Sequence, residues 1–275
     1  MVDKISLSAG VRSNLLSLQN TTTLINRTQT NLSSGLKVNS ALDDASAFFT
    51  AAALNNRASD LSTLKSDIDL AVSTIEAAIN GIDAITELVQ QAKGLANQAK
   101  ATGDTAERST LAVQFNALLD QIDDLANDSS FNGTNLIQAS PDDLDVDFNA
   151  DGSTGLTISG LDSTTGTAGL DITEATNDFG DDTAISASLT EITTALTSLR
   201  TNASTLGSNN SVLQTRLNYT TDIVNTLEIG AGKLTLADLN EESANLLALQ
   251  TRQQLGINSL SLSARTEQLL LGLFG

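Results

Sequence analysis

The chain has 275 residues, a formal net charge of −19, and neither cysteine nor histidine. It therefore lacks a thiolate, the usual general base and the commonest transition-metal ligand, so an enzyme is the least expected class and no cofactor is predicted. An acidic surface repels phosphate, so we expect no nucleic-acid partner. No apolar run approaches the length of a membrane span, so we expect no membrane insertion.

The N-terminal part predicts two helices. Apolar residues near heptad spacing predict the first over residues 8–36, which residues 33–35 interrupt, and the second over residues 43–101. The second helix carries an apolar ladder whose spacings alternate between four and three, which keeps one stripe turned toward a partner helix. The positions of this predicted seam are Leu54, Leu61, Ile68, Ile75, Ile82 and Val89.

A third helix is predicted after a short break. Asp104 and Glu107 have the spacing of a capping box at its start. Asn132 followed by Gly133 predicts a tight turn beyond its end. The paired acids of this part of the chain, such as Asp123 with Asp124, are interpreted as solvated faces, because no apolar pocket surrounds them to raise a pKa.

Residues 141–184 differ in composition, with eleven acidic residues and no lysine or arginine. Apolar alternation predicts two short strands around residues 144–148 and 156–158, with a turn at 149–152. Residues 147–152 also match the first half of a calcium-binding loop. Position twelve of that loop is Ile158 where calcium needs a bidentate glutamate, so an ordinary hairpin is favoured and no metal is expected.

The C-terminal part repeats the helical pattern. A long helix is predicted from Ser188, with Glu191 as its capping-box partner, and Gly230 and Gly232 are expected to interrupt it before a last helix over residues 236–271. Its ladder begins already at Ile185. The seam positions in this ladder are Ile192, Leu199, Leu206, Leu213 and Leu227.

These patterns predict a mainly α fold. The N- and C-terminal arms form an elongated antiparallel coiled-coil bundle, with a small β-rich insertion at its tip. Residues 1–40 with 235–275 form outer terminal helices that are disordered in the monomer. Residues 41–140 with 185–234 form an inner helical rod domain with a β-hairpin. Residues 141–184 form a short, acidic, exposed region.

The last residues are almost wholly apolar, and a slender pair of helices cannot bury them all. Such a surface predicts association between copies, and head-to-tail contacts that do not close into a ring produce an open helical filament, a homo-polymer. The predicted assembly residues are Val11, Leu15, Leu18, Ile25, Leu32, Leu36, Leu246, Ile257, Leu260, Leu269, Leu270, Leu271, Leu273 and Phe274.

Three segments carry a family resemblance. The run LSSGLKVNSALDDA at residues 32–45 resembles the bacterial flagellin signature LSSGLRINSAxDDAA. Residues 131–137 are similar to the FNGxxLL element of the same family. Residues 236–246 and 249–257 resemble its closing helix. Together the matches cover about 140 N-terminal and 90 C-terminal residues in the order that flagellins have.

The resemblance implies a subunit of the extracellular flagellar filament that serves motility. Flagellins pair their terminal segments in the filament core and are exported unfolded through the flagellar type III apparatus. The implied partners are this export apparatus, an export chaperone, and the filament cap and junction proteins. Secretion without a cleaved signal peptide is expected, since the N-terminus lacks an apolar core and a cleavage site. Gln91 stands where some flagellins have an arginine sensed by a host receptor, which argues against receptor activation.

Two alternatives stay open at this point. The hook–filament junction protein shares the terminal helices but forms only a short ring. An extracellular coiled-coil adhesin or binding module is the second alternative. The motifs at residues 32–45 and 131–137 favour the filament subunit over both.

Overall fold

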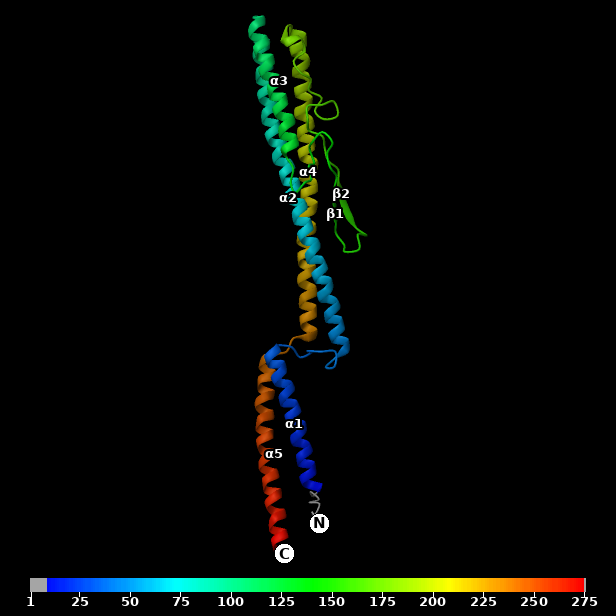
Figure 1. Ribbon diagram of the computed structural model, residues 1–275, viewed down its shortest axis with the longest axis vertical. Helices are drawn as coiled ribbons and strands as arrows, with labels where there is room; N and C mark the ends of the chain where they lie inside the picture. Colours follow the sequence, from blue (N-terminus) through cyan, green and yellow to red (C-terminus); the bar gives the residue numbers. More distant parts are fainter. Residues whose placement is uncertain (1–8, 275) are drawn as a thin grey trace. The chain divides into compact units, whose positions relative to one another are not determined.

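A computed structural model describes residues 9–274 of the chain, and side chains as far as residue 266 (Figure 1). The predicted fold class, mainly helical with a small β insertion, is confirmed. The elements in chain order are α1 (Ala9–Ser34), α2 (Ala45–Ala101), α3 (Thr105–Asp128), β1 (Leu144–Asp147), β2 (Gly155–Ile158), the 3₁₀ turn η1 (Thr176–Phe179), α4 (Asp182–Thr235) and α5 (Leu239–Phe274).

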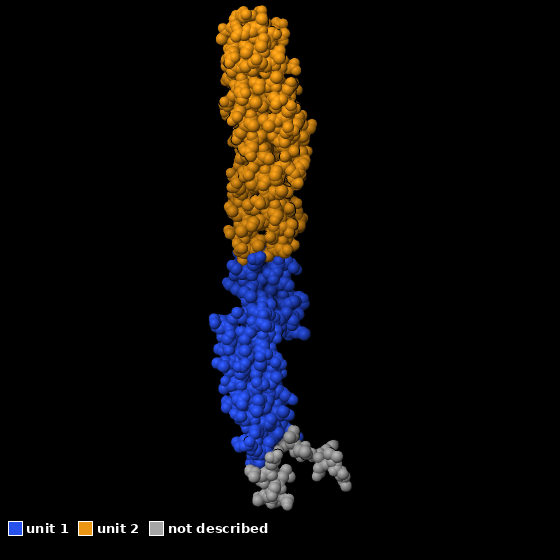
Figure 2. Space-filling view, turned by 60° about the vertical axis from the view of Figure 1, so that its left-hand side comes forward, with its two compact units in different colours: residues 1–57, 226–275 blue, residues 58–225 orange. Residues whose placement is uncertain are grey.

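The chain divides into two compact units, coloured in Figure 2. Unit 1 comprises residues 1–57 and 226–275, and unit 2 comprises residues 58–225. Helices α2 and α4 each contribute residues to both units, whereas α1 and α5 belong to unit 1 and α3 with the hairpin belongs to unit 2.

In unit 1, α1 packs along α5 (Figure 1). Helix α1 ends because Gly35 adopts a φ of +73°, a left-handed conformation that glycine tolerates at a helix C-terminus. The chain just beyond α1 then pairs with the chain just beyond α4. The N–H of Lys37 donates to the carbonyl of Thr235 at 2.8 Å, and the N–H of Ala237 donates to the carbonyl of Gly35 at 2.9 Å. The segment between α1 and α2 and the segment between α4 and α5 are thus joined by backbone hydrogen bonds.

In unit 2, α3 and parts of α2 and α4 run side by side and share one hydrophobic core (Figure 1). Heptad-spaced apolar side chains of α2 and α4 pack together with apolar side chains of α3. Phe115 of α3 also stacks edge-on against Phe179 of η1, with ring centroids 5.2 Å apart. The large side chains at the centre of this core are Ile68, Ile75, Ile82, Ile85, Val89, Phe115, Ile122, Phe179, Ile185, Ile192, Leu199, Leu206 and Leu213.

The β-hairpin agrees with the prediction. β1 and β2 pair antiparallel, with Val146 opposite Leu156, and Gly152 closes the connecting turn with a φ of +66°. The predicted turn at Asn132 and Gly133 is also present. Both residues have positive φ, and residues 131 and 134 on either side exchange backbone hydrogen bonds of 2.9 and 3.0 Å. Asn-Gly is the preferred pair for such a turn.

The start of α3 confirms the predicted cap but not the full capping box. Oδ1 of Asp104 accepts a hydrogen bond from the N–H of Ala106 at 2.8 Å. Glu107 does not return to the N–H of Asp104. Its carboxylate instead accepts from the hydroxyl of Thr102 at 2.7 Å, and this hydroxyl accepts from the N–H of Asp104 at 3.2 Å. The threonine thus bridges the two acids.

The predicted start of the long C-terminal helix is wrong by about two turns. α4 begins at Asp182, where Oδ1 of Asp181 accepts from the N–H groups of residues 183 and 184. Ser188 is buried inside the helix, and the carboxylate of Glu191 binds Thr173. The helix starts earlier because Ile185 is fully buried in the core of unit 2, so burial stabilises the extra turns.

The predicted interruption at Gly230 and Gly232 is also wrong, since α4 continues to Thr235. Two glycines in a helix cost about 1 kcal/mol each relative to alanine. Here Ala231 between them is buried, and Gly230 lies opposite the side chain of Leu54 in unit 1. Tertiary contact therefore offsets the poor local propensity.

Two glycines of α2 generate a testable prediction. A Cβ at Gly81 would overlap the hydroxyl of Ser129 and lie 2.7 Å from Cδ1 of Ile137, whereas a Cβ at Gly94 would meet nothing within 4 Å. Gly81→Ala should therefore destabilise the folded chain by about 1–3 kcal/mol through overpacking. Gly94→Ala should stabilise it by roughly 0.5–1 kcal/mol through helix propensity. Chemical denaturation followed by circular dichroism measures both, and equal shifts for the two variants would contradict this packing.

Candidate functional site: an apolar surface on unit 1

Large apolar side chains are exposed mainly on unit 1. In the described part of the chain, sixteen are exposed, and only Leu70, Val113, Val212 and Tyr219 of these belong to unit 2. The twelve exposed apolar residues of unit 1 are Leu15, Leu16, Leu24, Leu42, Phe49, Ile229, Leu236, Leu239, Leu247, Leu255, Ile257 and Leu262.

Helix α5 shows why this exposure is unusual. One face, with Leu246, Leu249 and Leu260, is half-buried in unit 1. Other faces carry Leu247, which is 68% exposed, and Leu255, which is 64% exposed. A helix that is apolar on more than one face needs more than one partner to bury it, and the helix that packs along α5 among the described residues of unit 1 is α1.

The predicted assembly residues occupy three environments. Val11 and Ile25 are buried within unit 1. Leu15 and Ile257 are exposed, at 39% and 47%. The half-buried members are Leu18, Leu32, Leu36, Leu246 and Leu260. The side chains of Leu269, Leu270, Leu271, Leu273 and Phe274 lie outside the described residues.

The sequence interpretation missed several exposed residues. Leu247, Leu255 and Leu262 recur at spacings of eight and seven on α5, which is a detectable helical signal beside the stripe that faces α1. Leu42, in the turn between α1 and α2, is 97% exposed and has no periodic signal. Only the tertiary structure identifies it as exposed.

The predicted seam residues lie in both units. Leu54 and Leu227 are half-buried and belong to unit 1. The other seam residues all belong to unit 2, where each is 8% exposed or less: Leu61, Ile68, Ile75, Ile82, Val89, Ile192, Leu199, Leu206 and Leu213. They stabilise the subunit itself, since fully burying each such side chain contributes about 1.5–3 kcal/mol.

Charge is divided as unequally as apolar exposure. Unit 1 contains eight acidic and eight basic residues, and unit 2 contains 25 acidic and six basic residues. Unit 1 is therefore neutral, and unit 2 carries the whole formal charge of −19. A neutral surface lets copies of unit 1 approach one another without the mutual repulsion that unit 2 generates.

A polar network surrounds the helix break in unit 1. Asn31 is buried in α1, where it donates to Glu242 of α5 at 2.9 Å and accepts from the side chain of Asn39 at 3.1 Å. Oδ2 of Asp43 accepts from the N–H and hydroxyl of Ser40 at 2.9 and 3.1 Å. The Ser40 N–H is the main reason that the pKa of Asp43 lies below its usual value.

Helix carboxylates hold the irregular segment before α4. Asp123 of α3 accepts from the N–H of Thr165 at 2.7 Å and also from its hydroxyl. Glu191 of α4 accepts from the N–H and hydroxyl of Thr173, both at 3.0 Å. The interpretation of Asp123 as part of a solvated face is therefore wrong. Among the described residues, the segment around Thr165 has no neighbouring strand to accept its N–H groups, so the carboxylate of Asp123 on α3 accepts one of them.

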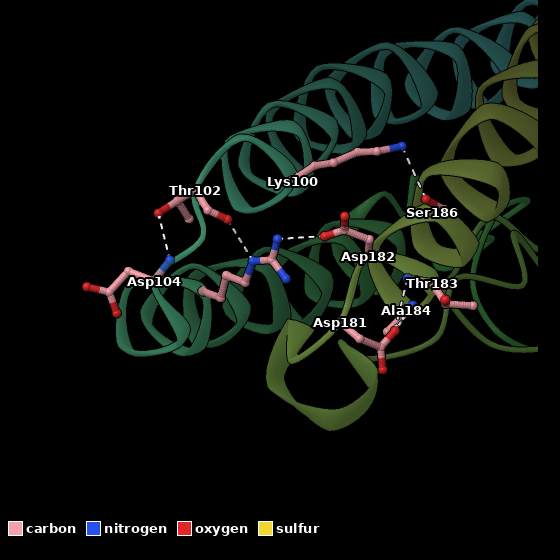
Figure 3. Close-up of polar contacts among 9 residues, drawn as sticks. Lys100, Thr102, Asp104, Asp181, Asp182, Thr183, Ala184 and Ser186 are labelled. Carbon is pink, nitrogen blue, oxygen red and sulfur yellow. Dashed lines mark hydrogen bonds and ion pairs between the residues drawn. The ribbon is translucent and has the colours of Figure 1, made fainter.

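One end of unit 2 is tied together by polar contacts, shown in Figure 3. Arg108 of α3 donates to the carbonyl of Thr102 at 2.9 Å and to Asp182 of α4 at 2.6 Å. Lys100 at the end of α2 donates to Ser186 of α4 at 3.2 Å. These contacts connect the ends of all three helices, and the Arg108 side chain is only 11% exposed, which limits competition from water.

Gln91 lies on the exposed side of α2. Together with Gly94 and Leu95 of α2 and Gln114 and Leu118 of α3, it lines a surface cavity of about 430 Å³. The cavity walls are amide and aliphatic groups, so this surface has no guanidinium fork for multidentate contacts.

The described residues contain no cluster of three or more side chains suited to hold a metal ion. At the calcium-like motif, Asp151 accepts from the N–H of Ser153 and serves the hairpin turn. No helix within the described residues is long and apolar enough to cross a membrane.

Comparisons with known proteins identify the family. Residues 5–141 match the bacterial flagellin N-terminal helical region, and residues 189–274 match the bacterial flagellin C-terminal helical region. The chain belongs to the bacterial flagellins. Flagellin FljO and flagellin FljK of Caulobacter vibrioides are 31% and 32% identical to it over 274 residues, which is 99% of this chain and of each relative.

Other matches cover less of the chain. A flagellin of Brucella melitensis is 30% identical over 178 residues, 62% of this chain and 63% of the relative. The crystal structure of Bacillus cereus flagellin matches with a TM-score of 0.49 and 20% identity, covering 56% of this chain and 88% of that one. As a flagellin, the chain is a structural subunit of the extracellular flagellar filament.

The Arg108 contacts of this flagellin can be tested by stability measurements. Arg108→Lys keeps the charge but not the planar fork that reaches two acceptors, so it should lower the unfolding free energy by about 1–2 kcal/mol. Asp182→Asn should cost less, about 0–1 kcal/mol, because Asp182 is 70% exposed. Thermal unfolding compares them, and an Arg108→Lys chain that melts like the wild type would rule out the double contact.

Proposed function

We propose that the exposed apolar surface of unit 1 is the surface through which this flagellin polymerises. The observation that carries the proposal is the concentration of exposed apolar side chains on the neutral unit, twelve against four on unit 2. Patches of this kind mark association sites, and copies that stack without closing a ring form a filament.

With this surface as the contact between copies, each part of the chain has its own role in the filament. Residues 1–40 with 235–275 build the filament core through their exposed apolar side chains and through the predicted assembly residues at 269–274. Residues 41–140 with 185–234 form the inner rod domain around the seam. Residues 141–184 bury apolar side chains such as Phe179 in the core of unit 2 and place their acidic side chains on the outside of the filament. The charge of unit 2 supports this arrangement, because like-charged surfaces are best kept in contact with solvent and counterions.

The remaining partners are inferred from the family. The chain leaves the cell through the flagellar export apparatus with the help of an export chaperone, without a cleaved signal peptide, and joins cap and junction proteins at the filament ends. It acts as a structural protein and not as an enzyme, which the absence of histidine and cysteine supports.

Two matched substitutions test the assembly surface. Leu255 on α5 of unit 1 and Val113 on α3 of unit 2 are both 64% exposed, so an aspartate at either position should change monomer stability by only about 0.5 kcal/mol. Leu255→Asp should prevent filament formation, because assembly would bury an unpaired charge. Val113→Asp should still polymerise. Electron microscopy of the purified chains distinguishes these outcomes, and normal filaments from Leu255→Asp would refute the proposed surface.

A truncation tests the apolar end. Removing residues 269–275 should abolish polymerisation and leave the helical signal of unit 2 intact, since the core of that unit contains none of these residues. Sedimentation and circular dichroism measure the two properties on one sample. The contrasting variant is Leu206→Asp, which places a charge in the fully buried core and should unfold unit 2. Filaments of normal length from the truncated chain would exclude residues 269–275 from the assembly surface.

A further inference from the structure

A cavity of about 440 Å³ in unit 1 is lined by three basic side chains. They are Arg27 of α1, Lys37 in the segment after α1, and Lys233 of α4. Within the described residues, none of the three has a carboxylate within the ion-pair distance of 4 Å, unlike Arg108, which pairs with Asp182. The ammonium of Lys37 donates to a neutral acceptor, the backbone carbonyl of Lys233, at 3.1 Å.

The acidic side chains of the same cavity are already engaged by neutral donors. Asp44 accepts from the N–H of Ala47 at 3.0 Å, which caps α2. Glu242 accepts from the amide of Asn31 at 2.9 Å. Asp43 binds the turn before α2, as described above, and Arg27 attracts it only through the longer-range field. The carboxylates thus organise the loop, and the three cations keep donors available for another acceptor.

We propose that this cavity binds a carboxylate from unit 2 of a second copy of the chain. The lining is formally neutral, since Asp43, Asp44 and Glu242 balance the three cations, so the donors that these cations leave unpaired identify the occupant. A carboxylate is the acceptor that they lack, and unit 2, with 25 acidic and six basic residues, is the strongly anionic part of this protein. The cavity has room for an aspartate or glutamate side chain. The inference rests on the proposed function, since polymerisation is what brings a second copy to the cavity.

Such a contact sets how neighbouring copies align. Apolar association is non-directional, whereas Arg27 offers a planar fork and the two lysines offer rotatable donors to a carboxylate. A charge pair across an interface fixes register and suppresses wrong arrangements more than it adds raw affinity. The contact also draws the anionic unit of one copy toward the neutral unit of the next, which relieves part of the repulsion between anionic units.

Cross-linking in mixed filaments tests the contact directly. Filaments are assembled from equal amounts of unlabelled and ¹⁵N-labelled chains and treated with a water-soluble carbodiimide, which joins a lysine amine to a carboxylate in contact with it as water is lost. We expect linked peptides that combine the two labels, with Lys37 or Lys233 joined to an acidic residue of 58–225. Filaments whose links from these lysines are confined to single-label pairs would overturn the proposal.

Matched charge variants provide a second readout. Arg27→Gln, Lys37→Gln and Lys233→Gln together remove the three cations of the cavity. The control combines Arg12→Gln, Arg57→Gln and Arg252→Gln, three exposed positions of unit 1 outside the cavity, and has the same net charge. We expect the cavity variant to raise the critical concentration for polymerisation about fivefold over the control. A rise no larger than that of the control would overturn the proposal.

The outcomes separate this inference from the proposed function. Wild-type chains that form no filaments would overturn both. Wild-type filaments that yield no mixed-label links, together with equal critical concentrations for the two triple variants, would overturn the cavity contact alone. Circular dichroism of both monomers confirms that each variant is folded.

Discussion

A long helix in water requires a partner for every apolar face that it carries, because helix propensity alone does not hold it. In unit 2 this requirement is met within one chain. Helices α2, α3 and α4 surround a continuous core, and its largest side chains are fully buried. In unit 1 it is met only in part. Helix α5 packs on α1 and leaves Leu247, Leu255 and Leu262 in contact with solvent. We propose that the unburied faces of unit 1 are the ones through which this flagellin assembles.

The polar groups complement this division. Unit 1 is formally neutral and unit 2 carries the whole charge of −19, so the repulsion between copies comes from the unit that has few exposed apolar side chains. Within unit 2, several carboxylates also stabilise the fold by accepting hydrogen bonds from the backbone. Asp123 and Glu191 accept from backbone N–H groups of the irregular segment, and Asp181 caps α4. A segment with so little regular structure depends on such side-chain acceptors, because a buried N–H without a partner is costly.

Local patterns predicted much of this fold. Heptad spacing locates the long helices, Asp104 marks the start of α3, and Asn132 with Gly133 marks a turn, because each signal acts over only a few residues. The errors arose where a distant contact outweighed the local signal. α4 passes through Gly230 and Gly232 because Ala231 is buried, and it starts before Ser188 because Ile185 is buried. Whether a glycine ends a helix, or a serine starts one, can be predicted only when the residues that surround it in space are known.

The amino-acid sequence by itself determined the helical class, the acidic composition of residues 141–184 and the family, since composition, periodicity and motifs are properties of neighbouring residues. Tertiary structure decided which apolar faces remain exposed, and it gathered Arg27, Lys37 and Lys233 around one cavity. It also decided that Asp123 binds a backbone 42 residues away. The physical reason is the same in each case. A repeat specifies the face on which a side chain lies, whereas burial and pairing depend on the groups that folding brings against that face.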